Sequence, residues 1–144
     1  MIVEHTVVID LPIDEVWEVF TDAGLFREWQ EELVDYEQVS GEFLELGAVA
    51  DLTFRRSSGD TTLSETIAER EEGSLLTASY TGLPVQFSIE NHFDAIDDDT
   101  TEWTATAEVK LGLMHKPFSG MIKSGVTELA ETRAKSFKQY VENL

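Results

Sequence analysis

The chain has 144 residues, of which 42% are hydrophobic and 10% are aromatic. This apolar content excludes a disordered protein, and the length fits one domain, which we expect to span residues 1–144. The 29 acidic and 10 basic residues give a net charge of −19, which argues against nucleic acid binding through a basic patch. The absence of cysteine excludes disulfides and thiolate chemistry.

The negative charge is unevenly spread, with a net −15 over residues 1–72 and −4 over residues 73–144. A solvated acidic surface explains this negative charge. The alternatives are adaptation to salt and a basic protein partner. Residues 1–5 lack the basic and apolar pattern of a secretion signal, and no window approaches the ~18–20 apolar residues of a membrane span. We therefore expect a soluble cytoplasmic protein without stable membrane insertion.

In chain order, the first predicted element is a strand over residues 2–11, which is rich in Val and Ile. Pro12 and the acidic residues after it favour a helix start. Apolar residues at intervals of three and four then predict a short helix over 12–21. The same spacing recurs after a glycine and predicts a second short helix around 25–29.

Between residues 33 and 111 the apolar period changes to two, and turn signals rich in Gly, Ser and Asp divide the segment. The short intervals are typical of antiparallel strands joined by hairpins. The clearest alternation, from Val85 through Phe87 and Ile89, predicts a strand with one apolar face and one solvent-exposed face. We expect six strands, at about 33–40, 48–56, 61–71, 74–81, 85–95 and 101–111.

The last part of the chain returns to a period of 3.6 and predicts one long helix of about 27 residues, or about 40 Å. Pro117 lies near its start, and its apolar stripe includes Phe118 and Met121. Gly120 and Gly125 are expected to let the helix pass close to the sheet. Because a curved sheet must bury its apolar face, this helix is the only predicted element long enough to cover it.

The segment Ile9–Asp22, IDLPIDEVWEVFTD, and the later Trp29 resemble the opening pattern of the START-like (SRPBCC) superfamily of lipid-transport and polyketide cyclase/dehydrase proteins. Gly47 and the run from Met114 to Leu144 also fit, so the resemblance covers the whole chain. It implies an α+β helix-grip fold, with a curved antiparallel sheet of about seven strands around a long C-terminal helix and two short helices after strand one. In similar proteins, the space between sheet and helix is a hydrophobic cavity.

The leading hypothesis is that the chain binds a small hydrophobic molecule, lipid or polyketide-like, in this cavity. The alternatives are a polyketide cyclase/dehydrase-type enzyme that uses the same cavity, and a protein-interaction module in which acidic residues within 28–45 meet a basic partner. Apolar side chains of inward parity can also simply fill a core. On parity and size, the predicted ligand contacts are Trp29, Leu52, Phe54, Tyr80, Phe87, Ile89, Asn91, Trp103, Met114, Phe118, Met121 and Ile122.

The candidate catalytic groups for the enzyme alternative are Glu65, Tyr80, Asn91 and His115. An unbroken strand would point Glu65 into the cavity, where burial would raise its pKa and make it a candidate acid or base. A β-bulge would instead turn it outward. Asn91 is either a ligand contact or a structural amide, and His115 would lie near the cavity mouth.

Other chemistry finds no support in the sequence, and we expect neither a metal nor a cofactor. The three histidines lie far apart, and the chain lacks the HExxH motif of zinc enzymes. The acidic run at 97–99 lacks the spaced ligands of a calcium loop and is typical of a polar turn. No dinucleotide fingerprint or nucleophile elbow occurs.

Overall fold

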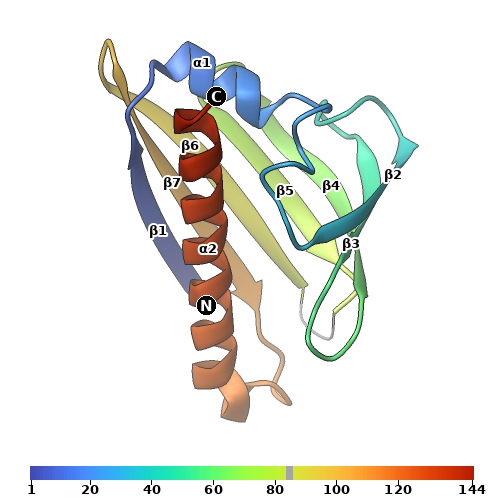
Figure 1. Cartoon of the computed structure of the whole chain (residues 1–144). Coiled ribbons are helices and arrows are strands. Elements are labelled where there is room, and N and C mark those ends of the chain that lie inside the picture. Colours follow the sequence, from blue (N-terminus) through green and yellow to red (C-terminus); the bar gives the residue numbers. More distant parts are fainter. Residues whose placement is uncertain (84–85) are drawn as a thin grey trace.

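Seven antiparallel strands form one curved sheet, in a computed structural model that describes residues 1–83 and 86–144. The strands are β1 (Ile2–Ile9), β2 (Leu33–Ser40), β3 (Val49–Phe54), β4 (Thr61–Glu71), β5 (Leu75–Thr81), β6 (Gln86–Asp97) and β7 (Thr100–Lys110). Their spatial order is β1-β7-β6-β5-β4-β3-β2. The long helix α2 (Ser119–Glu142) lies along the concave side, and α1 (Ile13–Phe20) covers one end (Figure 1). This is the helix-grip arrangement that the resemblance implies.

The strands agree closely with the apolar alternation of the sequence. The predictions at 33–40 and 61–71 match β2 and β4 residue for residue, and the ends of the other strands differ by one or two residues. Val85, the expected first residue of the strand at 85–95, lies outside the described residues. Alternation defines which residues form a strand better than it defines where the strand ends.

The prediction of a second short helix around residues 25–29 is wrong, because this segment forms consecutive turns. The Leu25 N–H donates to the Asp22 carbonyl (3.2 Å), and the Glu28 N–H donates to the Leu25 carbonyl (2.9 Å). Both bonds span three residues, whereas the bonds of an α-helix span four. The apolar spacing therefore marks buried positions in this segment without marking a helix.

The long helix α2 has 24 residues, fewer than the 27 or so expected, and a 3-10 turn at Lys116–Phe118 (η1) precedes it. Its buried residues are Ala134, Phe137 and Val141, all of them in its second half. Residues 119–130 are all described, and none of them is buried. The apolar stripe therefore covers the sheet only along the second half of the helix.

The predicted role of the two helix glycines is wrong. A Cβ added to Gly120 or Gly125 would meet no atom within 4 Å outside the neighbouring residues and the backbone of the helix itself. Neither glycine is therefore needed for a close approach of α2 to the sheet.

Five aromatic side chains, called here the aromatic cluster, pack together at the end of the sheet that α1 covers. Phe20 contacts the other four, with ring centroids 4.9 to 5.8 Å apart. These rings come from α1, the turns after it, β6, β7 and α2, so one cluster joins elements from the whole chain. Its members are Phe20, Trp29, Phe93, Trp103 and Phe137.

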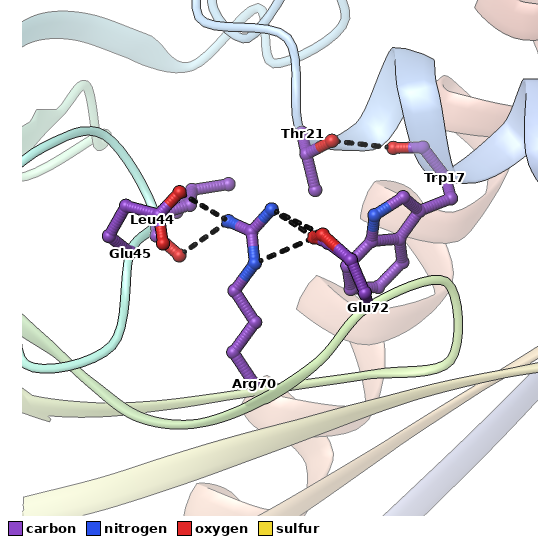
Figure 2. Close-up of polar contacts among 6 residues, drawn as sticks. All are labelled: Trp17, Thr21, Leu44, Glu45, Arg70 and Glu72. Carbon is purple, nitrogen blue, oxygen red and sulfur yellow. Dashed lines mark hydrogen bonds and ion pairs between the residues drawn. The ribbon is translucent and has the colours of Figure 1, made fainter.

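Arg70, near the end of β4, holds the turn that follows β2 against α1 (Figure 2). Its Nη1 donates to the Leu44 carbonyl oxygen at 2.8 Å and lies 3.9 Å from a Glu45 carboxylate oxygen. Its Nε donates to Glu72 Oε1 at 3.0 Å, and its guanidinium carbon lies 5.6 Å from the centre of the Trp17 ring. Because Leu44 has φ of 55°, a conformation that side chains rarely adopt, these contacts stabilise a strained turn.

Candidate functional site

Three apolar side chains point into the space between the sheet and α2 without being fully covered. Phe54 shares a face of β3 with the buried Leu52, and Phe87 and Ile89 share a face of β6 with the buried Asn91. All three are half-buried and pack against the core, and we call them the half-buried group. The inner face is therefore less fully covered here than at the aromatic cluster.

A carboxyl and a phenol lie opposite each other on β4 and β5. Glu65 pairs with Tyr80 in the strand register, and the Tyr80 hydroxyl donates to Glu65 Oε2 at 2.8 Å. Only 3% of the surface of Glu65 is exposed. The register is continuous from Ser64 to Ile67, and its irregularity falls between Ile67 and Glu69. The inward orientation of Glu65 is confirmed, and the alternative of a bulge that turns it outward is wrong.

Burial controls the protonation of this pair. It raises the pKa of Glu65, although the Tyr80 hydrogen bond and the Arg133 charge each lower that pKa. Burial also raises the pKa of Tyr80 well above its ordinary value, and the nearby Glu65 raises it further. Tyr80 is therefore a neutral donor, and burial favours the protonated form of Glu65, which carries one more O–H.

Asn91 of β6 links Trp103 and Arg133 through its side-chain oxygen. Its Oδ1 accepts hydrogen bonds from Trp103 Nε1 at 3.2 Å and from Arg133 Nη1 at 3.5 Å. Its Nδ2 donates to the Leu76 carbonyl at 3.1 Å. The side chain therefore makes the contacts of a structural amide, and it also places its oxygen beside the guanidinium of Arg133.

Arg133 of α2 brings a positive charge into this interior, and the sequence reading missed it. Its guanidinium carbon lies 5.3 to 5.7 Å from the ring centres of Phe20, Trp29 and Trp103, which is the range of cation–π contacts. A signal was present, because Arg133 lies four residues before the buried Phe137 and so on the same helix face. Glu65, Tyr80, Asn91 and Arg133 together form what we call the polar group.

Three of the predicted ligand contacts, Trp29, Leu52 and Trp103, are fully buried core residues. Trp29 differs from the other two because its Nε1 is buried and has no hydrogen-bond partner among residues 1–83 and 86–144. A buried donor without a partner lowers stability. An acceptor atom of a bound molecule would satisfy it.

Several predicted site residues do not lie in this interior. Met114, Phe118 and Met121 are exposed, so they lie on the surface and not on the buried stripe that their spacing predicts. Ile122 and His115 are half-buried. The spacing of residues on a helix shows which side chains share a face, but the position of the sheet decides which part of that face is covered.

Two hollows on the surface are lined by none of the predicted ligand contacts. One, of about 330 Å³, is lined by residues that include Phe26, Tyr36 and Phe43. The other, of about 430 Å³, runs along α2 and includes Lys123 and Glu131. Neither hollow includes a member of the half-buried group or of the polar group.

The sequence model of one protein family, described as polyketide cyclase / dehydrase and lipid transport, matches residues 1–142. A comparison with curated proteins finds no match. The match covers all but the last two residues of the chain.

Solved structures share the fold at low sequence identity. Ara h 8.0201 is 13% identical with a TM-score of 0.80, covering 100% of this chain and 99% of the other. The Zhui aromatase/cyclase from Streptomyces sp. R1128 is 17% identical with a TM-score of 0.81, covering 99% and 93%. Truncated norcoclaurine synthase from Thalictrum flavum is 16% identical with a TM-score of 0.76, covering 98% and 92%. At such identities the likeness concerns the fold alone.

Proposed function

Because this chain belongs to the polyketide cyclase/dehydrase and lipid transport family, we propose that it binds a small hydrophobic molecule, lipid or polyketide-like, between the sheet and α2. The observation that carries the proposal is the half-buried group, Phe54, Phe87 and Ile89. These side chains point inward but stay partly accessible, and residues 119–130 of α2 leave that part of the sheet less covered. Apolar walls with a few polar groups are typical of ligand sites.

The polar group favours a ligand with an oxygen-rich end. The Arg133 guanidinium and the Trp29 Nε1 are donors, and Glu65 adds a third in its protonated form, which burial favours. Such a concentration of donors favours a carbonyl, carboxylate or sulfonate oxygen. The proposed ligand therefore carries such an oxygen next to an apolar body.

Two fluorescent probes of nearly the same shape test this proposal. 1-Anilinonaphthalene-8-sulfonate carries an anion, whereas N-phenyl-1-naphthylamine carries no charge. We expect both to bind, and we expect Ile89→Trp, which fills space beside Phe87, to weaken both. Arg133→Met should weaken the sulfonate probe by about tenfold or more, because a hydrogen bond to a charged group contributes about 1.5–3 kcal/mol, and should leave the neutral probe nearly unchanged.

Lys123→Met is the matched control, since Lys123 is an exposed cation on the same helix. It should leave the affinity of both probes unchanged. Native mass spectrometry of the purified chain gives an independent result, a co-purified small molecule. The proposal fails if neither probe binds the folded chain and no such molecule is found, or if Lys123→Met is as harmful as Arg133→Met.

A second candidate function is a cyclase/dehydrase-type enzyme, and the buried pair of Glu65 and Tyr80 favours it. An acid whose pKa is raised by burial, hydrogen-bonded to a phenol, has the arrangement of a general acid. The probe substrate is a linear poly-β-ketone thioester. We expect it to close a ring by an intramolecular aldol reaction and then to lose one molecule of water, and mass spectrometry measures this loss. Glu65→Gln and Tyr80→Phe should each slow it by about a hundredfold or more, and unchanged turnover in both variants would exclude this assignment.

A further inference from the structure

Four large apolar side chains lie exposed within nine residues of the chain. They are Leu113, Met114, Phe118 and Met121, and their exposed fractions are 82%, 85%, 55% and 74%. Single exposed apolar residues are ordinary on protein surfaces, but a contiguous group of them marks an interaction site. The segment around η1 therefore has the properties of a binding surface.

The charge around these side chains is opposite to that of the rest of the molecule. Segments 55–60 and 109–127, which we call the basic tip, contain five of the 10 Lys and Arg residues and one of the 29 acidic residues. Their net charge is +4, against −23 for the rest of the chain. The exposed apolar side chains thus lie in the part of the chain where positive charge is concentrated.

Both segments lie at the same end of the sheet. β3 and β7 are separated by three strands in an antiparallel sheet, so they run in the same direction and their last residues, Phe54 and Lys110, lie at one end. Figure 1 shows the loop after β3 and the turn η1 at the end of the molecule away from α1. The α2 helix extends about 36 Å from there, several times the ~8 Å screening length at physiological salt, so distant acidic residues act weakly at the tip.

We propose that the basic tip docks on the surface of an anionic lipid membrane. The apolar side chains would enter the boundary between headgroups and acyl chains, while Lys110, Lys116 and Lys123 meet the lipid phosphates. The apolar residues form an exposed end of the molecule and line neither of the two hollows described above, which suits a fluid surface better than a rigid partner. Among the helices of residues 1–83 and 86–144, none has the length and apolar content of a membrane span.

Docking at this end has a consequence for the ligand proposed above, although the docking itself does not depend on that ligand. Phe54, at the end of β3, and Phe87, near the start of β6, belong to the half-buried group and lie toward the same end of the sheet. A membrane at the tip would therefore face the less covered part of the interior. A lipophilic molecule could then pass between bilayer and protein with little exposure to water.

Vesicle co-sedimentation of the full chain tests the proposal. We expect binding to vesicles that contain about one-third phosphatidylglycerol in phosphatidylcholine, little binding to pure phosphatidylcholine, and loss of binding as salt rises. Lys116→Glu combined with Lys123→Glu should weaken binding by about 25-fold or more, on the basis of about fivefold for each lysine near the surface. Leu113→Ser combined with Met114→Ser should also weaken it, with an unchanged melting temperature because both side chains are exposed.

Leu46→Ser combined with Ile96→Ser is the matched control, since both residues are exposed apolar side chains outside the basic tip. This variant should bind vesicles as the unchanged chain does. The proposal is overturned if the unchanged chain ignores anionic vesicles, if it binds both vesicle types equally, or if the control is as harmful as the tip variants. Self-association that the tip substitutions abolish, in a chain that does not bind vesicles, would assign the surface to a second copy instead.

Discussion

Glu65 combines burial with an ionisable group, and this combination has a consequence for stability. In the unfolded chain the side chain loses its proton near its ordinary pKa of about 4.5, whereas burial raises that pKa in the folded chain. Between the two values the folded state holds a proton that the unfolded state has lost. The contribution of Glu65 to the free energy of unfolding therefore falls as pH rises through this window.

Glu65→Gln removes this titration while it keeps an oxygen that can accept from Tyr80. We expect the free energy of unfolding of the variant, relative to that of the unchanged chain, to increase from pH 4 upward by at most about 1.4 kcal/mol per pH unit. The increase should end where Glu65 ionises in the folded protein. Denaturant titrations at several pH values measure this difference.

Glu69→Gln is the control, because Glu69 is exposed on the same strand. Its stability relative to the unchanged chain should show a much weaker dependence on pH. An equal dependence in both variants would contradict the assignment of the effect to the buried carboxyl.

At the level of single residues, the sequence predicted orientation well and partners poorly. Parity placed Glu65 inside because β4 is regular as far as Ile67. It did not place Arg133, because a charged residue on an amphipathic helix is normally assigned to the solvent side. The aromatic rings around its guanidinium come from three other parts of the chain, and no local pattern predicts that meeting.

At the level of elements, two glycines illustrate opposite uses of the same residue. Gly125 lies within α2, where an added Cβ meets no neighbour, so a glycine there only lowers helix stability. Gly82 has φ of 120°, and an added Cβ would lie 2.7 Å from the Thr62 carbonyl oxygen. The first glycine is replaceable, whereas the second is required by backbone geometry.

The two alanine substitutions should therefore change stability in opposite directions. Gly125→Ala should raise the free energy of unfolding by about 1 kcal/mol, the usual difference in helix propensity. Gly82→Ala should lower the free energy of unfolding by about 1–3 kcal/mol or more, because a strained backbone conformation carries a penalty of about this size. Equilibrium unfolding in urea measures both, and a loss of stability in Gly125→Ala would show that α2 needs flexibility at that position.

Elements were predicted best where the pattern is local and repeated. The hairpins of β2 to β7 follow from alternation and turn residues, which need no knowledge of distant segments. The prediction of a helix at 25–29 is wrong because Phe26 and Trp29 are buried side chains that lie in consecutive turns and not in a helix. The prediction that Phe118 and Met121 face the interior is wrong, because helical periodicity does not show where the sheet beneath a helix ends.

For the whole molecule, the uneven charge is the dominant electrostatic feature. Outside the basic tip, a net −23 is spread over a small domain, and repulsion among these charges opposes the compact state. The alternative of an acidic surface within 28–45 that meets a basic protein stays a prediction. The repulsion itself has a direct test.

Salt should raise the melting temperature of the chain. Between about 0.01 M and 1 M salt the screening length falls from about 30 Å to 3 Å, and each kcal/mol of repulsion removed should raise the melting temperature by about 2–4 °C. Differential scanning calorimetry in sodium chloride measures the effect. Asp98→Asn combined with Asp99→Asn should raise the melting temperature at low salt and reduce its salt dependence, and a melting temperature that falls with salt would contradict this account.

The strand order also sets the sequence of events by which the chain folds. β2 to β7 each pair with the strand next to them in the sequence, so this part of the sheet can grow hairpin by hairpin. β1 is an edge strand that pairs with β7, and the register joins Ile2 to Glu108, so its partner appears about a hundred residues later. During synthesis we therefore expect β1 to stay unpaired until β7 has emerged, so that its docking onto β7 and α2 is a late step in folding.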